Sequence, residues 1–323
     1  MAMSADSPAL ELRGISKSYG KFQAVRSLDL VVPRGSTYGV LGPNGAGKTT
    51  TIRMALRILE PDSGDIRILG EPQSQKGLDR IGYLPEERGV YKRMTVKRLL
   101  SFMAELKGVS ARDAAPRITQ WLERFDLTDW TDKKVQELSK GMQQKLQFIG
   151  SVLHDPEIVI LDEPFSGLDP INQQILRDIV VELKRADKTI IFSTHIIEHA
   201  DRICDHVCII AEGQKVADGT VPQVKKDFGG EYVAIRFERP DTDGERLLRA
   251  LPTVERVRQH GTQAEVALRA GADPNELLVH LVNQGVRLRR FECTEPSLEE
   301  IFLGRVAAVE PRPAVDEREA AHV

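Results

Sequence analysis

Apolar and polar residues alternate in short stretches between Leu10 and Val32, and turn-forming residues interrupt the alternation at Tyr19-Gly20 and Pro33-Arg34-Gly35. A period of two is typical of half-buried strands, and glycine and proline mark the turns between them. The pattern therefore predicts antiparallel strands in this first part of the chain.

The next part of the chain predicts a mostly parallel sheet. Its apolar stretches have the length of buried strands, and helical segments such as 50–59 and 171–185 separate them. A hairpin over 207–216, turning at Glu212-Gly213, is expected to close the unit. The strand candidates are Ser36–Leu41, Ile81–Pro85, Ile158–Leu161 and Thr189–Thr194.

A helical insert is predicted between the second and third of these strands, over about 88–155. Residues 95–106, 114–125 and 141–153 each carry apolar side chains at spacings of three and four, which is the period of a helix with one buried face.

A smaller α+β domain is expected after the hairpin. Its elements follow the order β-α-β-β-α-β, which predicts a ferredoxin-like arrangement, with a last helix near 298–302. We expect a first domain over 8–228, a second over 229–305, and a disordered tail over 306–323 that is rich in Pro, Glu and Ala. The six elements are Glu231–Glu238, Gly244–Leu251, Val254–Gln259, Ala264–Arg269, Pro274–Asn283 and Val286–Cys293.

Composition excludes some classes of protein. The 323 residues carry a net charge of -3 with a sequence pI of about 6.2, so no nucleic acid partner is expected. No run of 18 apolar residues occurs and Met1–Glu11 lacks the layout of a signal peptide, which predicts a cytoplasmic protein. The three cysteines are too few for a disulfide framework.

The segment Gly42-Pro-Asn-Gly-Ala-Gly-Lys-Thr fits the phosphate-loop pattern G-x-x-x-x-G-K-[ST], and it lies between a predicted strand and a predicted helix. Glycines let backbone N–H groups surround a phosphate, Lys48 adds a positive charge, and the Thr49 hydroxyl is a ligand for Mg²⁺. We expect nucleotide binding by Gly42, Pro43, Asn44, Gly45, Ala46, Gly47, Lys48, Thr49 and Thr50.

Two carboxylates at the end of a buried strand complete this chemistry. In Ile158–Pro164, read as IVILDEP, Asp162 is expected to hold Mg²⁺ through a water molecule. Glu163 is then the candidate general base for the attacking water. ATP and Mg²⁺ are therefore the expected ligands.

A second helix start, Leu138-Ser-Lys-Gly-Met-Gln-Gln, precedes this strand, and with it the chain resembles the ATP-binding cassette (ABC) family over about 10–219. Further segments match in the family's order: Tyr19, a segment resembling the Q-loop at 83–87, SGLD at 166–169, and His195. The resemblance implies a P-loop α/β core and an ATPase that hydrolyses ATP to ADP and phosphate.

The resemblance also implies roles for single residues. Tyr19 would stack on adenine with Val25 beside it, His195 would contact the γ-phosphate, and Asp169 would lie at the seam of a dimer.

In this family two cassettes pack head to tail, so that the signature helix of one cassette points at the γ-phosphate bound to the other. Ser139, Lys140 and Gly141 are the signature residues expected to act in trans, and Ser139 is the expected γ-phosphate contact. Ser139 is also a plain helix N-cap by its residue type, and both roles can hold together.

Two positions depart from the family pattern. Glu86 stands where glutamine is usual, and as a carboxylate it predicts tighter metal binding with altered turnover; alternatively it points to solvent. Lys140 stands where glycine is usual, and it either attracts the phosphate or projects into solvent at the rim of the dimer.

The runs Tyr83–Tyr91 and Glu295–Leu303 resemble those of ABC exporter subunits of the sodium-efflux type. This resemblance implies a separate membrane permease, a second cassette, most simply another copy of this chain, and a peripheral position on the inner face of the membrane. The expected cargo is sodium or another small solute or drug. The rival reading is an ABC ATPase acting in translation or DNA maintenance, but a single motif set and a short insert disfavour it.

Two groups of residues have near-ligand spacing for a metal, namely His195 with His199, and Cys204 with His206 and Cys208. Because the cysteines enter a predicted strand among apolar residues, no zinc site is expected. The C-terminal domain is expected to stabilise a dimer or regulate the ATPase, with a passive appended domain as the alternative.

Overall fold

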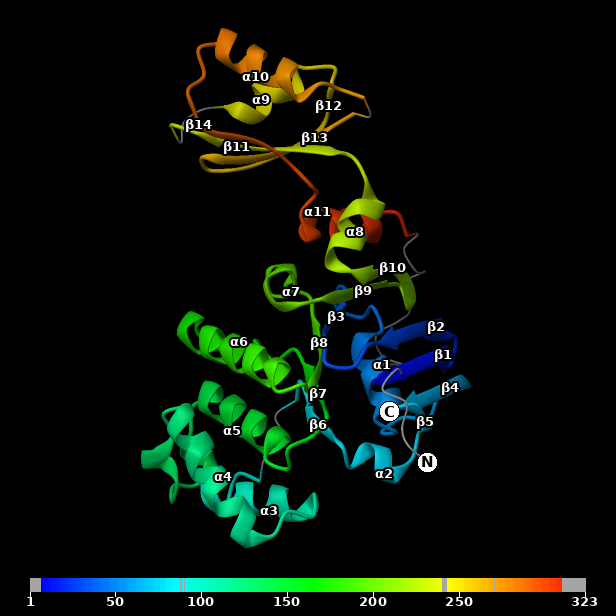
Figure 1. The fold of residues 1–323 in the computed structure, drawn as a ribbon, viewed down its shortest axis with the longest axis vertical. Helices are drawn as coiled ribbons and strands as arrows, with labels where there is room; N and C mark the ends of the chain where they lie inside the picture. Colours follow the sequence, from blue (N-terminus) through cyan, green and yellow to red (C-terminus); the bar gives the residue numbers. More distant parts are fainter. Residues whose placement is uncertain (1–6, 88, 90, 240–242, 270, 310–323) are drawn as a thin grey trace. The chain divides into compact units, whose positions relative to one another are not determined.

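The computed structural model describes residues 7–87, 89, 91–239, 243–269 and 271–309. Contacts between residues divide the chain into two compact units, Met1–Thr220 with Arg305–Val323, and Val221–Gly304. Each unit has its own sheets and its own core, and the two are described separately (Figure 1).

The centre of the first unit is a mostly parallel sheet, which has six strands in the described part of the chain, in the order β10-β9-β3-β8-β7-β6. Strands β6, β7, β8, β3 and β9 run parallel, and β10 pairs antiparallel with β9. Strands β3, β7 and β8 are buried throughout, as expected for a sheet covered on both faces. The strands are β3 (Thr37–Leu41), β6 (Ile81–Leu84), β7 (Ile158–Asp162), β8 (Thr189–Thr194), β9 (His206–Ala211) and β10 (Gln214–Thr220).

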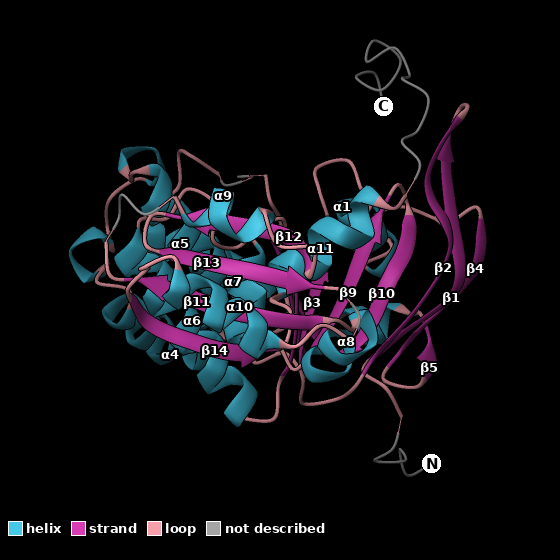
Figure 2. Ribbon diagram, turned by 90° about the horizontal axis from the view of Figure 1, so that it is seen from above, coloured by secondary structure: helices cyan, strands magenta, loops and turns pink. Residues whose placement is uncertain are grey.

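An antiparallel sheet in the order β2-β1-β4-β5 forms the second layer. The long strands β1 and β2 make a hairpin through the turn after Tyr19, and Figure 2 shows them with β4 as a twisted group of strands. Alternate residues of β1 and β2 are buried, which accounts for the alternation in the sequence. The strands are β1 (Leu10–Tyr19), β2 (Phe22–Val32), β4 (Ser63–Ile68) and β5 (Glu71–Pro72).

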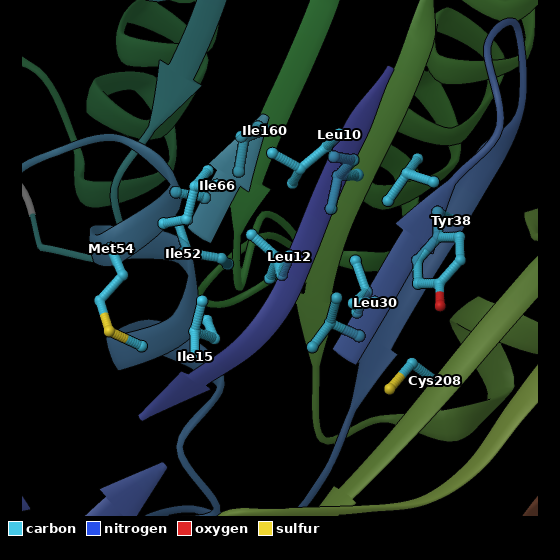
Figure 3. Close-up of a cluster of buried hydrophobic side chains, with 14 of the residues drawn as sticks. Leu10, Leu12, Ile15, Leu30, Tyr38, Ile52, Met54, Ile66, Ile160 and Cys208 are labelled. Carbon is cyan, nitrogen blue, oxygen red and sulfur yellow. The ribbon is translucent and has the colours of Figure 1, made fainter. Parts of the chain in front are cut away.

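Helix α1 (Lys48–Ala55) shares one hydrophobic core with both sheets. Ile52 and Met54 of α1 lie in a cluster with Leu12 of β1 and Ile160 of β7 (Figure 3). The core therefore fixes the phosphate loop, which precedes α1, against both sheets.

The insert is helical in its described residues. Three helices begin at a serine or threonine whose hydroxyl accepts a backbone N–H, as Thr95, Ser110 and Ser139 do. Trp121, Phe125 and Phe148 pack as an aromatic cluster between α4 and α5. The elements are α3 (Val96–Leu106), α4 (Ala111–Arg124), η1 (Thr128–Trp130), η2 (Val135–Glu137) and α5 (Lys140–Val152).

Three further helices belong to the first unit. Helix α6 (Pro170–Arg185) packs on β8 and on α7 (Ile197–Ile203), which follows β8 directly. The short helix α2 (Gln75–Leu78) precedes β6.

The second unit contains the ferredoxin-like arrangement that its sequence predicts. Its sheet is antiparallel with the order β12-β13-β11-β14 in the described residues, and the apolar faces of α9 and α10 join it in one core. The elements are α8 (Val221–Phe228), β11 (Glu231–Phe237), α9 (Gly244–Arg249), β12 (Val254–His260), β13 (Gln263–Leu268), α10 (Pro274–Asn283), β14 (Leu288–Thr294) and α11 (Leu298–Ala307).

The contact-based division assigns helix α8 to the second unit, whereas the sequence pattern assigns it to the first domain. The compact units meet after Thr220, whereas the sequence pattern places the boundary at 228/229. Phe228 of α8 contacts Gly304 of α11, where a Cβ would come within 2.8 Å of its ring, so α8 packs with the second unit. Most of the tail expected over 306–323 lies outside the described residues, and Ala307 still belongs to α11.

The predicted elements differ from the observed ones mainly at their ends. The helix predicted over 50–59 begins at Lys48 and ends at Ala55. Arg57 has a φ of 55°, and a right-handed helix cannot continue through a residue with a positive φ. The pattern missed β4, whose first three residues are exposed and so give no alternation. It also missed α7 and α8, which are short.

Candidate functional site

The phosphate loop lies between β3 and α1, at the carboxyl end of the parallel sheet. Gly47 is the N-cap of α1 with a φ of 107°, and no side chain caps this helix start. The first backbone N–H groups of a helix have no partner within it, so they are donors for an anion here.

Two glycines of this loop are required by close packing. A Cβ on Gly42 would lie 2.4 Å from the Ile210 carbonyl oxygen, and a Cβ on Gly47 would lie 2.6 Å from the Ala24 carbonyl oxygen. Any larger residue would therefore push the loop away from the strands that support it. Val25, beside Ala24, is 1% exposed and packs under Gly47, so a direct contact between Val25 and a nucleotide stays a prediction.

The side chain of Lys48 is buried and folds back onto the phosphate loop. Its ammonium group donates to the carbonyl oxygens of Gly42 at 2.8 Å and Pro43 at 3.1 Å, and it lies 3.6 Å from Glu163 Oε1. Burial lowers the pKa of Lys48, and the nearby carboxylates of Glu163 and Asp162 oppose that shift. The pair joins the phosphate loop to the end of β7.

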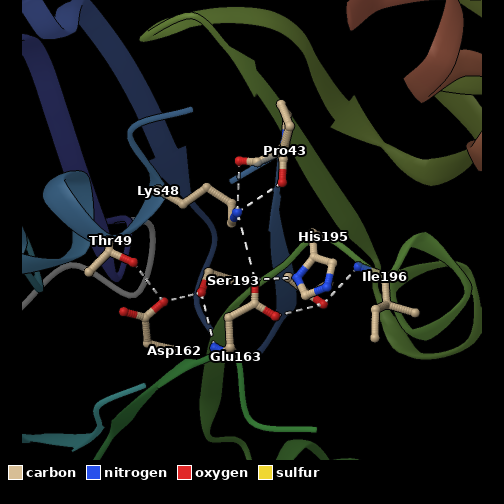
Figure 4. A network of polar contacts seen from close by, with 10 residues as sticks. Pro43, Lys48, Thr49, Asp162, Glu163, Ser193, His195 and Ile196 are labelled. Atoms are coloured by element: carbon tan, nitrogen blue, oxygen red, sulfur yellow. Dashed lines mark hydrogen bonds and ion pairs between the residues drawn. The ribbon is translucent and has the colours of Figure 1, made fainter. Parts of the chain in front are cut away.

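Asp162 is the last residue of β7 and Glu163 follows it directly, and Figure 4 shows Thr49 beside Asp162 and His195 beside Glu163. The Thr49 hydroxyl donates to Asp162 Oδ1 at 3.3 Å, and the Ser193 hydroxyl donates to the same oxygen. Asp162 is fully buried, and burial raises its pKa, while the bonds from Ser193 and Thr49 oppose the rise.

The second oxygen of Asp162, Oδ2, is buried and has no hydrogen-bond partner among the described residues. A buried carboxylate oxygen without a partner beside a threonine hydroxyl is a suitable hard-oxygen donor set for Mg²⁺, which takes one or two carboxylates and completes its shell with water and phosphate oxygens. The residues present therefore fit this ion.

Glu163 is held in a strained conformation. Its φ is 47°, which is uncommon for a residue with a side chain, and its N–H donates to the Ser193 carbonyl and hydroxyl oxygens, both at 3.2 Å. Its Oε1 lies 3.0 Å from His195 Nδ1, and its Oε2 accepts from the Thr194 hydroxyl at 3.3 Å. Both oxygens are thus oriented by the end of β8.

Three site residues escaped the sequence pattern. Ser193 and Thr194 looked like ordinary residues of a buried strand, but they hold Asp162 and Glu163 because β8 pairs with β7 in parallel register. Gln147 of α5 donates to the Glu87 carbonyl oxygen at 3.3 Å, which links the signature helix to the loop after β6. A buried glutamine on a helix face was the only available signal.

The remaining predicted residues lie apart from this cluster. Tyr19 ends β1 with 37% of its surface exposed. Ser139 and Lys140 are exposed at the start of α5, where the Ser139 hydroxyl accepts from Met142 N at 3.3 Å. Asp169 caps α6, and its bonds to the N–H groups of Asn172 and Ile171 lower its pKa.

Glu86 is exposed shortly after β6. Burial raises the pKa of Glu86, and the charges of Asp162 and Glu163 add to that rise. It therefore shares the electrostatic field of the two carboxylates. Part of the adjoining segment, at 88 and 90, lies outside the described residues.

The suspected metal-binding histidines and cysteines have other partners. His199 stacks on Phe165, and Cys208 belongs to the core of the first unit. Within the described ranges no group of three or more His, Cys, Asp or Glu side chains is arranged to hold a metal ion.

A glycine-rich loop before a helix, with a lysine, two carboxylates and a histidine at the carboxyl end of a parallel sheet, defines a P-loop nucleotide-binding protein. The ABC transporter family model matches residues 25–166, and the model for the C-terminal domain of DrrA1-3-like ATP-binding proteins matches 219–306. The chain belongs to the ABC transporter family, as an ATP-binding subunit.

Relatives match over nearly the whole length. An uncharacterized ABC transporter ATP-binding protein, YhaQ of Bacillus subtilis (strain 168), is 41% identical over 300 residues, covering 93% of this chain and 99% of the relative. The daunorubicin/doxorubicin resistance ATP-binding protein DrrA of Streptomyces peucetius is 34% identical over 306 residues, covering 91% of each chain. A solved ATP-binding subunit of an ABC transporter superposes with a TM-score of 0.65 at 32% identity, covering 68% of this chain and 93% of that one.

Proposed function

We propose that this chain hydrolyses ATP with Mg²⁺ and that the hydrolysis drives a separate membrane permease for export. The observation that supports it most is the cluster at the end of β7, where Glu163 contacts both His195 at 3.0 Å and Lys48 at 3.6 Å. A carboxylate held by a histidine beside a phosphate loop is suited to activate water for attack on a phosphoryl group.

The nucleotide would be bound by several parts of the first unit. The N–H groups at the start of α1 and the ammonium of Lys48 would bind its phosphates, and Thr50 would lie on the α-phosphate side. Tyr19 offers an exposed ring for adenine. Thr49 and Asp162 would hold Mg²⁺, with Glu86 as a further candidate ligand, and the bound ion would neutralise charge on the phosphate oxygens.

The chain's own residues supply the proton transfer. Glu163 would accept a proton from water. Its carboxylate is already oriented, because Oε2 accepts from the Thr194 hydroxyl and Oε1 lies beside His195 Nδ1. His195, with its Nδ1 toward Glu163, would direct its other ring nitrogen elsewhere, toward the γ-phosphate. Strain at Glu163 is consistent with a backbone that is held for this purpose.

A second cassette would complete the site. Ser139 and Lys140 are exposed at the N-terminus of α5, which lies far from the phosphate loop in the sequence. A helix N-terminus is suited to bind an anion, here one held by a partner. In a head-to-tail dimer, most simply of two copies, Ser139, Lys140 and Gly141 would contact the γ-phosphate bound by the other copy, with Asp169 at the seam.

Export through a permease is supported by the relatives. One relative is named for daunorubicin and doxorubicin resistance, and others for Nod factor export. Among the residues that the structure describes, no helix is long and apolar enough to cross a membrane. We place the protein at the inner face of the membrane, with the segment after β6 and the helical insert toward the permease.

The cargo is a small solute or drug, with sodium ions and an amphipathic organic compound as the two classes to separate. The purified complex with its permease should show ATPase activity that one of these two classes of cargo stimulates.

We propose that the C-terminal unit stabilises the dimer or regulates turnover. The rival role in translation or DNA maintenance is not favoured, because the relatives are transporter subunits.

The experiment that tests this function uses Glu163→Gln. Removing the base should lower the rate of phosphate release by about 100-fold or more, while ATP still binds, so that an ATP-bound dimer accumulates. Size-exclusion chromatography with ATP and Mg²⁺, beside a phosphate-release assay, measures both. A variant that hydrolyses ATP at the wild-type rate, or that stays monomeric with ATP, would contradict the proposal.

Glu86→Gln tests the departure from the family pattern. Replacing the carboxylate with an amide exchanges a charged oxygen ligand for a neutral, weaker one and removes a negative charge near Asp162 and Glu163. We therefore expect weaker Mg²⁺ binding, seen as a higher Mg²⁺ requirement, and a changed turnover. The Mg²⁺ concentration for half-maximal ATPase activity is the measurement. Glu87→Gln, at the next exposed carboxylate, is the control, and equal kinetics in all three proteins would mean that Glu86 only faces solvent.

A further inference from the structure

A buried histidine lies next to the site without belonging to it. His199 is 5% exposed on α7, four positions after His195. Its ring stacks on Phe165, which comes two positions after Glu163, with centroids 4.2 Å apart and planes 29° apart. The stack therefore connects the two segments that carry the Glu163–His195 contact.

A third segment joins this stack through a charged group. Arg177 of α6 directs Nη1 at His199 Nδ1 over 3.2 Å, and its other nitrogens donate to Gln174 Oε1 at 2.9 and 3.2 Å. Helix α6 starts at Asp169, the expected seam residue. Phe165 also packs edge-on against Phe192 of β8, with centroids 6.0 Å apart. Helix α6, helix α7 and the segment after Glu163 thus meet at one imidazole.

The hydrogen bond sets the protonation state of His199. A guanidinium can only donate, so Nδ1 must accept and the proton is on Nε2 of a neutral ring. Burial is the main cause that lowers the pKa of His199, and the positive charges of Arg177 and Arg202 lower it further. The carboxylates of Glu198 and Glu163 oppose this shift. An apolar ring would fill the same space, but it would leave Arg177 without this acceptor.

We propose that His199 is a positioning residue for ATP hydrolysis: its ring, held by Phe165 and Arg177, keeps the segment after Glu163, the helix after His195 and helix α6 in one fixed relation. This inference rests on the proposed function. Its physical basis is that a general base loses efficiency when its geometry shifts, and a displacement of about 1 Å can cost about 100-fold in rate.

The test compares His199→Ala, which removes stacking and the acceptor, with His199→Phe, which keeps the stacking and removes the acceptor. We expect kcat to fall by about 10-fold or more in His199→Ala and less in His199→Phe, with the KM for ATP and the affinity for a fluorescent ATP analogue unchanged within about 2-fold. A purely structural role would instead be fully restored by the phenylalanine. His260→Ala, at an exposed position of the second unit, is the matched control.

Arg177→Met keeps the proposal testable if the His199 variants fail to fold. Arg177→Met should lower kcat as much as His199→Phe does. The double variant Arg177→Met/His199→Phe should be no slower than either single variant, because each substitution removes the same hydrogen bond. Wild-type kcat in folded His199→Ala, or additive losses in the double variant, would overturn the inference. If the wild-type protein itself released no phosphate, the proposed function would fail instead, so the two failures are distinguishable.

Discussion

Glu163 shows how much of the site depends on single side chains. Its residue type and its place after a buried strand predicted a general base, and the structure gives it a φ of 47° and two oriented oxygens. Asp162 differs from it by one position but faces Thr49 and Ser193, with Oδ2 unpaired among the described residues. Asp162 is the last residue of β7, whereas Glu163 has already left the strand with a positive φ, so the two carboxylates point in different directions and can take separate tasks.

A pH dependence of stability follows from His154, just after α5. Its Nε2 lies 3.2 Å from the Ile81 carbonyl oxygen, and burial lowers its pKa from 6.5 to about 4, with Lys107 adding to the shift and Asp155 and Asp79 opposing it. The unfolded chain therefore binds this proton at a higher pH than the native protein. We expect the free energy of unfolding to fall as the pH drops from 6.5 toward 4 and then to level off.

Urea unfolding at about pH 7 and about pH 5 measures this effect. His154→Gln, which cannot take up the proton, should lose less stability over that interval than the wild type. His260→Gln, at an exposed position, should behave as the wild type does. An equal loss in all three proteins would assign the pH dependence to other groups.

At the scale of elements, helix starts carry much of the site. Helix α1 begins at a glycine without a side-chain cap, whereas α5 begins at Ser139, whose hydroxyl accepts from Met142 N. The uncapped start leaves donors for a phosphate held by the same chain. Helix α5 buries Leu146 and Ile149 and keeps Ser139 exposed at its start, so one helix contributes to the core and leaves its first residues free for the trans contact that we propose.

Ser139→Asp separates these two roles. Aspartate caps a helix about as well as serine, so the free energy of unfolding should change by less than about 1 kcal/mol. Its negative charge would repel a γ-phosphate of the partner cassette, so ATP-driven dimerisation in the Glu163→Gln background should be lost. Thr95→Asp at the start of α3 is the control. Unchanged dimerisation of Ser139→Asp would exclude the trans contact.

At the scale of the whole molecule, the described chain holds one phosphate loop and one signature helix start, in a first unit with its own core, and a ferredoxin-like second unit. Within the second unit the start of α11 is bonded to the sheet: Ser297, just before the helix, donates to Glu265, and Glu300 of α11 accepts from Arg256. The run resembling exporter subunits, Glu295–Leu303, thus has a packing function in this unit.

If each complete site needs two copies, the ATPase rate per protein molecule must depend on protein concentration. Below the dissociation constant of the dimer, the specific rate should rise with concentration, and it should level off above it. Assays over about two decades of concentration at saturating ATP, paired with light scattering, give the measurement. A constant specific rate in samples shown to be monomeric would contradict a shared site.

The sequence determined the elements whose signals are local. The glycines and lysine of 42–49, the apolar run before Asp162 and the β-α-β-β-α-β order each depend on residues close together in the chain, so periodicity and motif spacing were sufficient. The end of α1 at Ala55, the start of the second unit at Val221 and the strand β4 were not predicted, because neighbouring elements rather than local residues define them.

Only the tertiary structure decided which side chains meet. Ser193, Thr194 and Gln147 reach the site because β8 pairs with β7 and α5 packs on β6, contacts between residues far apart in the sequence. His199 had near-ligand spacing to His195 in the sequence, yet its partners are Phe165 and Arg177. Residue types define the chemistry that is available, whereas strand register and helix packing decide which groups come within bonding distance.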